Sequence, residues 1–338
     1  MKIANTKEIN QFFQRCNKNK DIDYNQFLDA PITKNNENKT MGKLAKNHHP
    51  LYQTDTYQPT LFLSTKEYLK NSYLKNINLS QIRQADCFYE PIEILPNRLF
   101  NYDEVIDDPK KELNDYLILK ALDTSYKTPC LWQNDEPWML IVPPESNTID
   151  KHANNAYGNV LTFGLGLGYF VYMALLNPKV VNITVIEKDQ TIIDMFYTYI
   201  LPQFTNQEKI TIIQDDAFNC FNHRYLKDYD YIFIDIWKNN EDGAYLIEKL
   251  LEQYNPNENV HYWIEGSCLH FMHFLIFDYL FAVYQNKENT NKTYNTRINK
   301  KIDIYFKKHN QTITDVNQLK HLIYNRQIIK DILSIKGN

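Results

Sequence analysis

Five short apolar segments that alternate with segments of helical length constrain the fold between residues 159 and 265. They are rich in β-branched and aromatic residues and read NVLTF, ITVIE, ITIIQ, YDYIFID and VHYWIE. Runs of this kind predict buried strands. Strands that alternate with helices form a mainly parallel sheet, because a helical crossover returns the chain to the same edge. We therefore predict an α/β fold with a doubly wound, mainly parallel sheet.

The segments between these strands predict helices. One covers residues 169–176 and ends before Pro178, which cannot continue a helix. A second begins after Asp189, a residue type that caps helix N-termini well. A third covers residues 242–254. With helices on both faces, the strands of the sheet are expected to be buried on both sides.

The chain from Ser267 onward reads as mostly helical, with one further strand predicted at residues 302–306. The aromatic run HFMHFLIFDYLFAVY predicts a helix that is buried in the core or forms the contact of a homodimer. We expect three parts: residues 1–150, residues 151–285 with the main sheet, and a C-terminal extension over 286–338.

The first part begins with polar and helical segments. Residues 34–47 are polar and turn-rich, which predicts a loop. Ser64 and Glu67 have the spacing of a capping box, and the apolar residues Leu69, Tyr73 and Ile77 recur every four positions. This pattern predicts one helix that carries the three apolar side chains on the same face.

The same part ends in a predicted hairpin. Residues 112–122 suggest another short helix, and the segments CLWQ and PWMLIVP flank a tight turn at Asn134, Asp135 and Glu136. In the segment before the first strand of the main sheet, we expect Glu145, Ser146 and Thr148 to cap a helix.

Composition excludes several classes of protein. The 338 residues carry a net charge of −4 and a pI near 6.2, which does not favour binding to duplex nucleic acid. The five cysteines are scattered, and the histidines lack partner ligands, so neither a disulfide framework nor a metal site is predicted. The N-terminus lacks an apolar signal region, and the most apolar run contains histidine and aspartate, so we expect a cytoplasmic protein without a membrane span.

The first strand of the main sheet leads directly into Gly164, Gly166 and Gly168, and then into a helix. Glycines allow a tight turn and the close approach of a ligand. A dinucleotide site would favour G-x-G-x-x-G, whereas Tyr169 follows the third glycine here. The observed spacing, G-x-G-x-G, is typical of S-adenosylmethionine sites.

Acids follow the next three strands. Glu187 ends the second strand, where a carboxylate can accept hydrogen bonds from both ribose hydroxyls. Asp216 and Ala217 follow the third strand, where an acid can bind the adenine amine and a small residue leaves room for the ring. Asp235 ends the fourth strand. Ligands bind open α/β sheets at this edge, so the four strand ends predict one site.

Together these motifs make the chain resemble the class I S-adenosylmethionine-dependent methyltransferases, and most closely their spermidine synthase-like branch. The matching segments are NVLTFGLGLGYF, VIEKD, QDDAFNCF and DYDYIFIDIW. The resemblance implies a Rossmann-like sheet of the seven-strand type and S-adenosylmethionine as cofactor. It implies cofactor contacts from Gly164, Leu165, Gly166, Gly168, Glu187, Lys188, Asp215, Asp216, Ala217 and Asp235.

The sequence departs from that branch at three positions. Leu165 and Leu167 fill the variable positions of a loop that usually reads G-G-G-D-G. Lys238 stands where a second, diamine-binding aspartate is usual, and a cation there would repel a cationic substrate. Polyamine transfer is therefore disfavoured, and a neutral or acidic acceptor is favoured.

Structural roles remain open for several of these residues. The glycines can serve helix-to-strand packing, Asp215 can be an exposed turn residue, and Asp216 and Asp235 can cap helices or turns. His152 is a candidate base near the cofactor or an ordinary surface histidine.

We interpret the chain as a methyltransferase that acts on a small-molecule acceptor, with Asp235 and His152 as candidate catalytic residues. An aminopropyltransferase and a non-catalytic adenosyl-binding module are the alternatives.

Overall fold

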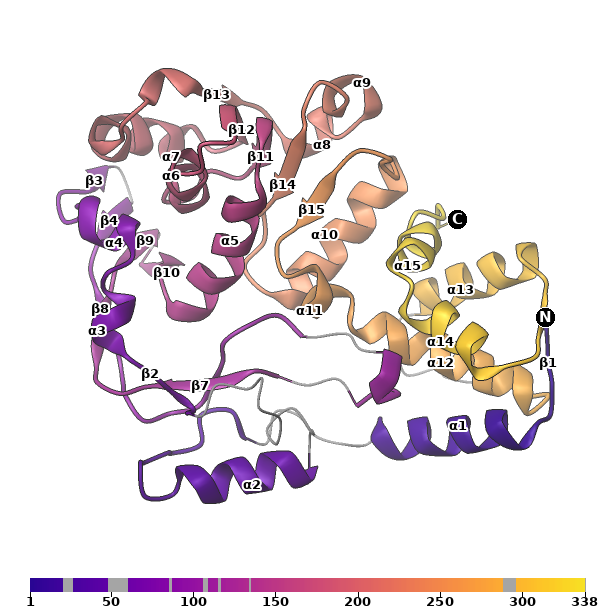
Figure 1. Cartoon of the computed structure of the whole chain (residues 1–338). Helices are drawn as coiled ribbons and strands as arrows, with labels where there is room; N and C mark the ends of the chain where they lie inside the picture. The colour runs from indigo at the N-terminus through magenta and orange to yellow at the C-terminus, as the bar shows by residue number, and fades with distance from the viewer. Residues whose placement is uncertain are drawn as a thin grey trace.

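The computed structural model describes residues 1–20, 27–47, 60–84, 87–105, 109–114, 117–133, 135–287 and 296–337. At its centre lies a five-stranded parallel sheet in the order β13-β12-β11-β14-β15 (Figure 1). These strands span Gly158–Phe163 (β11), Val180–Glu187 (β12), Ile210–Gln214 (β13), Tyr231–Ile234 (β14) and Val260–Tyr262 (β15). This strand order is that of a Rossmann-like doubly wound sheet, in which the topological switch point lies between β11 and β14. All five predicted strands are confirmed.

The sheet has fewer strands than the resemblance implies. Within the described residues it ends at β15, and the chain continues into α11 (Glu265–Leu269) and α12 (Phe271–Tyr284). The prediction of a seven-strand-type sheet is therefore wrong, because apolar helices follow the fifth strand. The stretch Glu265–Tyr284 is long and apolar enough to cross a membrane by composition alone, but 56% of it is buried inside the protein. The predicted buried helix is confirmed.

Helices flank the central sheet on both faces. Figure 1 shows α5 (Pro143–Asn155), α6 (Tyr169–Leu175) and α7 (Gln190–Met195) beside one face, and α10 (Asn240–Gln253) beside the other. The Asp189 carboxylate accepts a hydrogen bond from Thr191 N at 2.8 Å and so caps α7 as predicted. After α7 come a π-helical turn, Phe196–Ile200, and two 3-10 turns, Leu201–Gln203 and Gln207–Lys209. Two short helices follow β13: Ala217–Cys220 (α8) and His223–Leu226 (α9).

Three small sheets precede the central one. The first contains the predicted hairpin, in the order β10-β9-β4-β3, and leads directly into α5. Asn134, one of the residues predicted for the turn, lies outside the described residues. The other two have the orders β2-β7-β6 and β5-β8. Their strands are Phe62–Leu63 (β2), Arg83–Gln84 (β3), Cys87–Tyr89 (β4), Ile92–Ile94 (β5), Phe100–Asn101 (β6), Leu119–Leu122 (β7), Tyr126–Thr128 (β8), Cys130–Gln133 (β9) and Glu136–Leu140 (β10).

Two predictions for this part are wrong. The predicted loop at 34–47 contains α2 (Glu37–Asn47), which buries Leu44 in a small apolar cluster, so tertiary packing overrides the polar composition. The predicted helix at 112–122 is wrong because its end forms β7, with a 3-10 turn at Pro109–Lys111 before it. β7 is buried between β2 and β6, and these pairings decide its conformation.

The helix predicted from Ser64 is divided in two. Ser64 caps α3 (Thr65–Tyr68) as predicted, but Asn71 accepts a hydrogen bond from Tyr73 N at 2.9 Å and begins α4 (Ser72–Asn76). The break rotates the apolar residues relative to one another: Tyr73 is fully buried, whereas Leu69 is 47% exposed.

The N-terminal strand lies beside the C-terminal part of the chain (Figure 1). β1 (Lys2–Ile3) pairs with β16 (Thr312–Ile313), and α1 (Lys7–Asn19) contacts α14, one of three C-terminal helices. These helices are α13 (Thr296–Lys308), α14 (Val316–Tyr324) and α15 (Arg326–Leu333). The predicted strand at 302–306 is wrong because it lies within α13, where Ile298, Ile302 and Phe306 are all buried at a helical spacing.

Candidate functional site

A cavity of about 900 Å³ lies at the carboxyl ends of the central strands. It is lined by the loop after β11, by the end of β12, by the segment after β13 and by the end of β14. The residues predicted for cofactor binding that line it are Gly164, Leu165, Gly166, Glu187, Lys188, Asp215, Asp216, Ala217 and Asp235. Gly168 does not line the cavity. The topology thus brings together side chains that are more than 70 residues apart in the sequence.

The glycines of the loop serve different needs. A Cβ at Gly164 would lie 2.1 Å from the carbonyl oxygen of Asp235, and one at Gly168 would lie 2.4 Å from the Phe196 ring. Packing therefore requires glycine at these two positions, which agrees with the packing role considered above as the alternative to ligand binding. Gly166 also has a positive φ, 54°, but a Cβ there would meet only Met139, at 3.4 Å. Gly166 is the glycine that leaves space within the cavity.

Glu187 ties the end of β12 to the glycine loop. One carboxylate oxygen accepts a hydrogen bond from Leu165 N at 2.9 Å, and the other accepts one from Asp189 N at 2.9 Å. An ionised carboxylate offers about four lone-pair sites, so both oxygens keep acceptor capacity toward the cavity. Glu187 can therefore hold the loop and still accept hydrogen bonds from a ligand.

The two acids after β13 have local partners. Asp216 caps α8 by accepting a hydrogen bond from Phe218 N at 2.8 Å. Asp215 accepts hydrogen bonds from Asn219 Nδ2 and from Asp216 N, both at 2.7 Å, and these bonds lower the pKa of its carboxyl group. The capping role considered for Asp216 is present, and its second carboxylate oxygen remains available at the cavity wall.

Asp235 ends β14 and is half-buried at the cavity wall. Burial raises the pKa of its carboxyl group to about 7. It does not cap a helix, because α10 begins five residues later and is capped by the side chain of Asn239. A carboxyl group that titrates near neutral pH can accept or donate a proton under cellular conditions.

Glu145 is a cavity residue that sequence reasoning assigned to a helix cap. The N-cap position of α5 is Val142, with no side-chain cap, so the predicted capping by Glu145, Ser146 and Thr148 is wrong. Burial and the nearby Asp235 raise the pKa of Glu145 to about 8. Nothing in the sequence separates this glutamate from an ordinary acid in the first turn of a helix.

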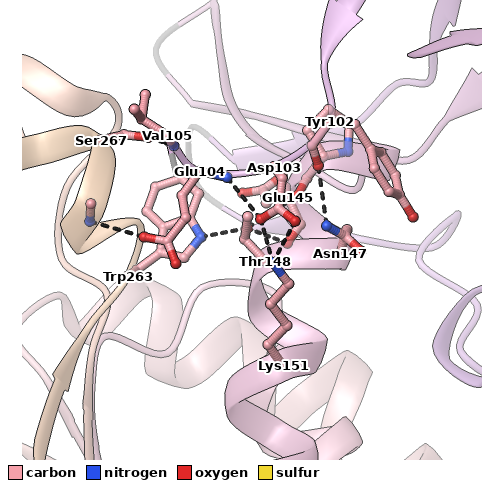
Figure 2. A network of polar contacts seen from close by, with 12 residues as sticks. Tyr102, Asp103, Glu104, Val105, Glu145, Asn147, Thr148, Lys151, Trp263 and Ser267 are labelled. Atoms are coloured by element: carbon pink, nitrogen blue, oxygen red, sulfur yellow. Dashed lines mark hydrogen bonds and ion pairs between the residues drawn. The ribbon is translucent and has the colours of Figure 1, made fainter. Parts of the chain in front are cut away.

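A segment from the N-terminal part closes another side of the cavity, and Figure 2 shows its contacts. Asn101 and Asp103 line the cavity. The segment is fastened to α11 because Val105 N donates to Ser267 Oγ at 2.8 Å and Gly266 N donates to Glu104 Oε2 at 2.9 Å (Figure 2).

The same segment is fastened to α5. Asn147 donates to the carbonyl oxygen of Tyr102 at 3.2 Å, and Lys151 forms an ion pair with Asp103 (Figure 2). No sequence motif predicted the position of this segment, which we call the 101–105 segment. It couples the N-terminal part to the main sheet.

Tryptophans form much of the remaining wall. Trp138, Trp237 and Trp263 line the cavity, and the Lys238 ammonium lies 4.2 Å from the centre of the Trp138 ring. The Trp263 indole donates to Thr148 Oγ1 at 2.9 Å. Four buried polar atoms of lining residues lack a hydrogen-bond partner within the described part of the chain: Asn101 Oδ1, Trp138 Nε1, Thr162 Oγ1 and Trp237 Nε1.

His152 does not line the cavity. Its Nδ1 lies 3.0 Å from the Tyr231 hydroxyl, and its ring packs against Phe233 and His261 between α5 and the sheet. Burial lowers its pKa to about 4, so the ring is neutral near neutral pH. The prediction of His152 as a catalytic base is wrong, because its neighbours enclose it away from the strand ends.

Comparisons with known proteins give limited similarity. No protein-family model matches the chain, and no curated protein matches its sequence. Similar solved structures include a candidate methyltransferase in complex with S-adenosylhomocysteine, which is 17% identical with a TM-score of 0.26 over 38% of this chain. A candidate caffeoyl-CoA O-methyltransferase from Staphylococcus aureus is 23% identical with a TM-score of 0.27 over 36% of this chain. A candidate methyltransferase from Streptococcus mutans is 17% identical with a TM-score of 0.26 over 40% of this chain. The aligned parts span 35%, 55% and 36% of those three chains.

Proposed function

We propose that this protein binds S-adenosylmethionine in the cavity and catalyses transfer of its methyl group to a small-molecule acceptor. The observation that carries the proposal is the convergence of Gly166, Glu187, Asp216 and Asp235 on one cavity at the strand ends. Parallel α/β sheets bind ligands at this edge. The volume, about 900 Å³, is at the upper end of the range for small-molecule sites, which leaves room for two reactants.

The residues present fit an adenosyl ligand. The space at Gly166 accommodates the methionine part beside the loop, and the spare acceptor capacity of Glu187 suits two ribose hydroxyls. Asp216 offers its second carboxylate oxygen to an adenine amine, and Ala217 and Phe218 supply small and apolar surface for the ring. The cavity therefore has an adenosyl half, which these residues form. Its other half, which we call the acceptor half, lies toward Glu145, Asp235 and the 101–105 segment.

Bound S-adenosylmethionine would supply an electrophilic methyl group for in-line displacement. The protein's contribution is to hold the acceptor in line and to exclude water. The 101–105 segment and Trp263 cover the acceptor half, and Asp235 can orient the acceptor or take its proton at a carboxylate oxygen.

Aminopropyl transfer remains the second candidate, because the acceptor half carries Glu145 and Asp235 and a hairpin precedes α5. This hairpin, β9–β10, resembles the hairpin-forming N-terminal segment that spermidine synthases carry. Lys238 weighs against a diamine because its ammonium group lies at the cavity wall. A non-catalytic adenosyl-binding module is the third reading of the same site.

Titration calorimetry tests the proposed function. The purified protein is titrated with S-adenosylmethionine, with S-adenosylhomocysteine and with NAD. We expect both adenosyl sulfur compounds to bind more tightly than NAD, because Tyr169 occupies the position at which a dinucleotide loop, G-x-G-x-x-G, has its third glycine. Tighter binding of NAD would contradict the proposal.

A further inference from the structure

Glu145 and Asp235 form a carboxyl pair that has no positive partner within the described residues. Glu145 belongs to α5 and Asp235 directly follows β14; both line one cavity, and Asp235 is near enough for its charge to raise the pKa of Glu145. Neither takes part in an ion pair with a described lysine, arginine or histidine. We call these two residues the carboxyl pair. A buried charge is costly unless it is paired, so the pair must hold a proton or receive a cation from a ligand.

The other charged groups around the carboxyl pair do not fill this need. Asp103 of the 101–105 segment is already paired with Lys151 of α5. Glu104 accepts a hydrogen bond from Gly266 N and adds no positive charge. Asp242 and Lys238 also line the cavity, near the start of α10, and the Lys238 ammonium lies over the Trp138 ring. This part of the wall therefore carries one acid and one lysine.

The thiol of Cys268 also lies near Asp235, and burial raises its pKa to about 12, so it stays neutral. Among these described groups around the carboxyl pair, Lys238 is the one cation that is not in an ion pair; a second cavity-lining lysine, Lys188, follows Glu187 at the end of β12.

Independent of these charges, buried polar atoms in the same cavity lack partners. Thr162 Oγ1 and Trp237 Nε1 belong to residues that are only 1% and 7% exposed, and neither has a hydrogen-bond partner within the described chain. Asn101 Oδ1, an acceptor, is in the same situation. Buried polar groups in native proteins are normally hydrogen-bonded, so these atoms point to a polar ligand. The Trp263 ring, which also lines the cavity, adds an aromatic surface that attracts cations, whereas the Trp138 ring already has the Lys238 ammonium over it.

We propose that the acceptor is a small primary or secondary monoamine, which binds as its ammonium ion at the carboxyl pair. This inference rests on the proposed function and names the substrate class of that same site. It differs from the expectation of a neutral or acidic acceptor, which rested on Lys238 and did not include Glu145. One unpaired carboxyl pair suits one ammonium group, and a second ammonium group on a diamine would approach Lys238.

The proton transfer follows from this arrangement. An N–H bond of the ammonium ion breaks, its proton moves to a carboxylate oxygen of the carboxyl pair, and the electron pair stays on nitrogen. When the methyl donor is bound, the N–C bond forms as the methyl C–S bond breaks, and the electrons of that bond stay on sulfur. The carboxyl pair then releases its proton to water, and the product leaves as a methylated ammonium ion.

Binding of matched analogues tests the charge preference without turnover. The protein is first saturated with S-adenosylhomocysteine and then titrated with tyramine, with its alcohol tyrosol and with its carboxylate analogue hydroxyphenylpropionate. Butylamine and butanol repeat the comparison without the aromatic ring. We expect each amine to bind at least about tenfold more tightly than its neutral analogue, and the anion to bind least.

Two variants locate the effect. Glu145→Gln and Asp235→Asn keep the shape of each side chain and should weaken amine binding at least about tenfold, while leaving the affinity for tyrosol within about twofold. Glu208→Gln makes the same change on an exposed carboxylate away from the cavity and should leave amine binding unchanged. Circular dichroism confirms that each variant is folded.

The outcomes separate this inference from the proposed function. If S-adenosylhomocysteine binds but alcohols or the anion bind as tightly as the amines, or no amine binds, the amine assignment is overturned and the proposed function stands. If S-adenosylhomocysteine does not bind but amines bind in a manner that depends on Glu145, the proposed function is overturned and the amine site remains.

Discussion

The carboxylate of Glu187 accepts a hydrogen bond from the backbone N–H of Leu165 at 2.9 Å, so the end of β12 fixes the glycine loop that follows β11. The same carboxylate holds Asp189 N, at the start of α7. One side chain thus positions two backbone segments at the cavity edge. This arrangement orients the loop before any ligand arrives, which lowers the ordering cost of binding.

The first prediction concerns Glu187→Ala. The variant loses the two backbone hydrogen bonds and the proposed ribose contacts, and a hydrogen bond to a charged group contributes about 1.5–3 kcal/mol. We expect S-adenosylhomocysteine to bind roughly ten- to a hundredfold more weakly in calorimetry. The matched control, Glu208→Ala, should bind as the parent does. An unchanged affinity in a folded Glu187→Ala protein would place the ribose elsewhere.

The second prediction separates the two roles of Asp216. Asparagine is as good an N-cap as aspartate, so Asp216→Asn should unfold at the same urea concentration as the parent. Its amide nitrogen would face the adenine amine, donor against donor, so adenosyl binding should weaken by about tenfold. Asp216→Ala should in addition lose about 0.5–2 kcal/mol of unfolding free energy with the cap. Equal binding by the Asn variant would leave capping as the function of Asp216.

The strands of the central sheet could be predicted from the sequence because their side chains are buried on both faces. Such strands carry uninterrupted apolar runs, and the positions of Glu187 and Asp235 follow from where each run ends. The N-terminal part behaved differently. β7 has only the four residues LKAL, and its conformation depends on pairing with β2 and β6, which are separate strands earlier in the chain.

The acceptor half of the cavity could not be predicted for the same physical reason. Asn101, Asp103 and Glu145 belong to no motif and come together only when the 101–105 segment packs onto α5 and α11. His152 shows the converse error: its place in the sequence, just before β11, suggested access to the cofactor. The orientation of α5 turns it toward Tyr231 instead.

The third prediction concerns stability and pH. Folding raises the pKa of Asp235 from 3.8 to about 7 and that of Glu145 from 4.5 to about 8. The folded state therefore binds protons more tightly than the unfolded state, and the unfolding free energy falls as the pH rises from about 4 to about 8. Glu145→Gln removes part of this dependence.

Urea unfolding at pH 5 and at pH 8 measures the effect. We expect Glu145→Gln to lose less stability than the parent between the two values, by on the order of 1 kcal/mol, because the variant has no buried carboxylate to ionise at that position. Glu208→Gln should follow the parent. A parallel loss in Glu145→Gln and the parent would mean that Glu145 is ionised in the folded protein at both pH values.

The last prediction distinguishes methyl transfer from aminopropyl transfer. In one reaction the protein is incubated with putrescine and decarboxylated S-adenosylmethionine, and in the other with tyramine, butylamine and methyl-labelled S-adenosylmethionine. We expect label in the monoamine products and no spermidine, because the second ammonium group of putrescine would approach Lys238. Asp235→Asn should lower label transfer by at least about a hundredfold, since general-base contributions are typically 10²–10⁴-fold, whereas Glu208→Gln should retain it. Spermidine formation that disappears in Asp235→Asn would overturn the methyltransferase assignment. If neither product forms although S-adenosylmethionine binds, the protein is an adenosyl-binding module, and the carboxyl pair then serves recognition without transfer.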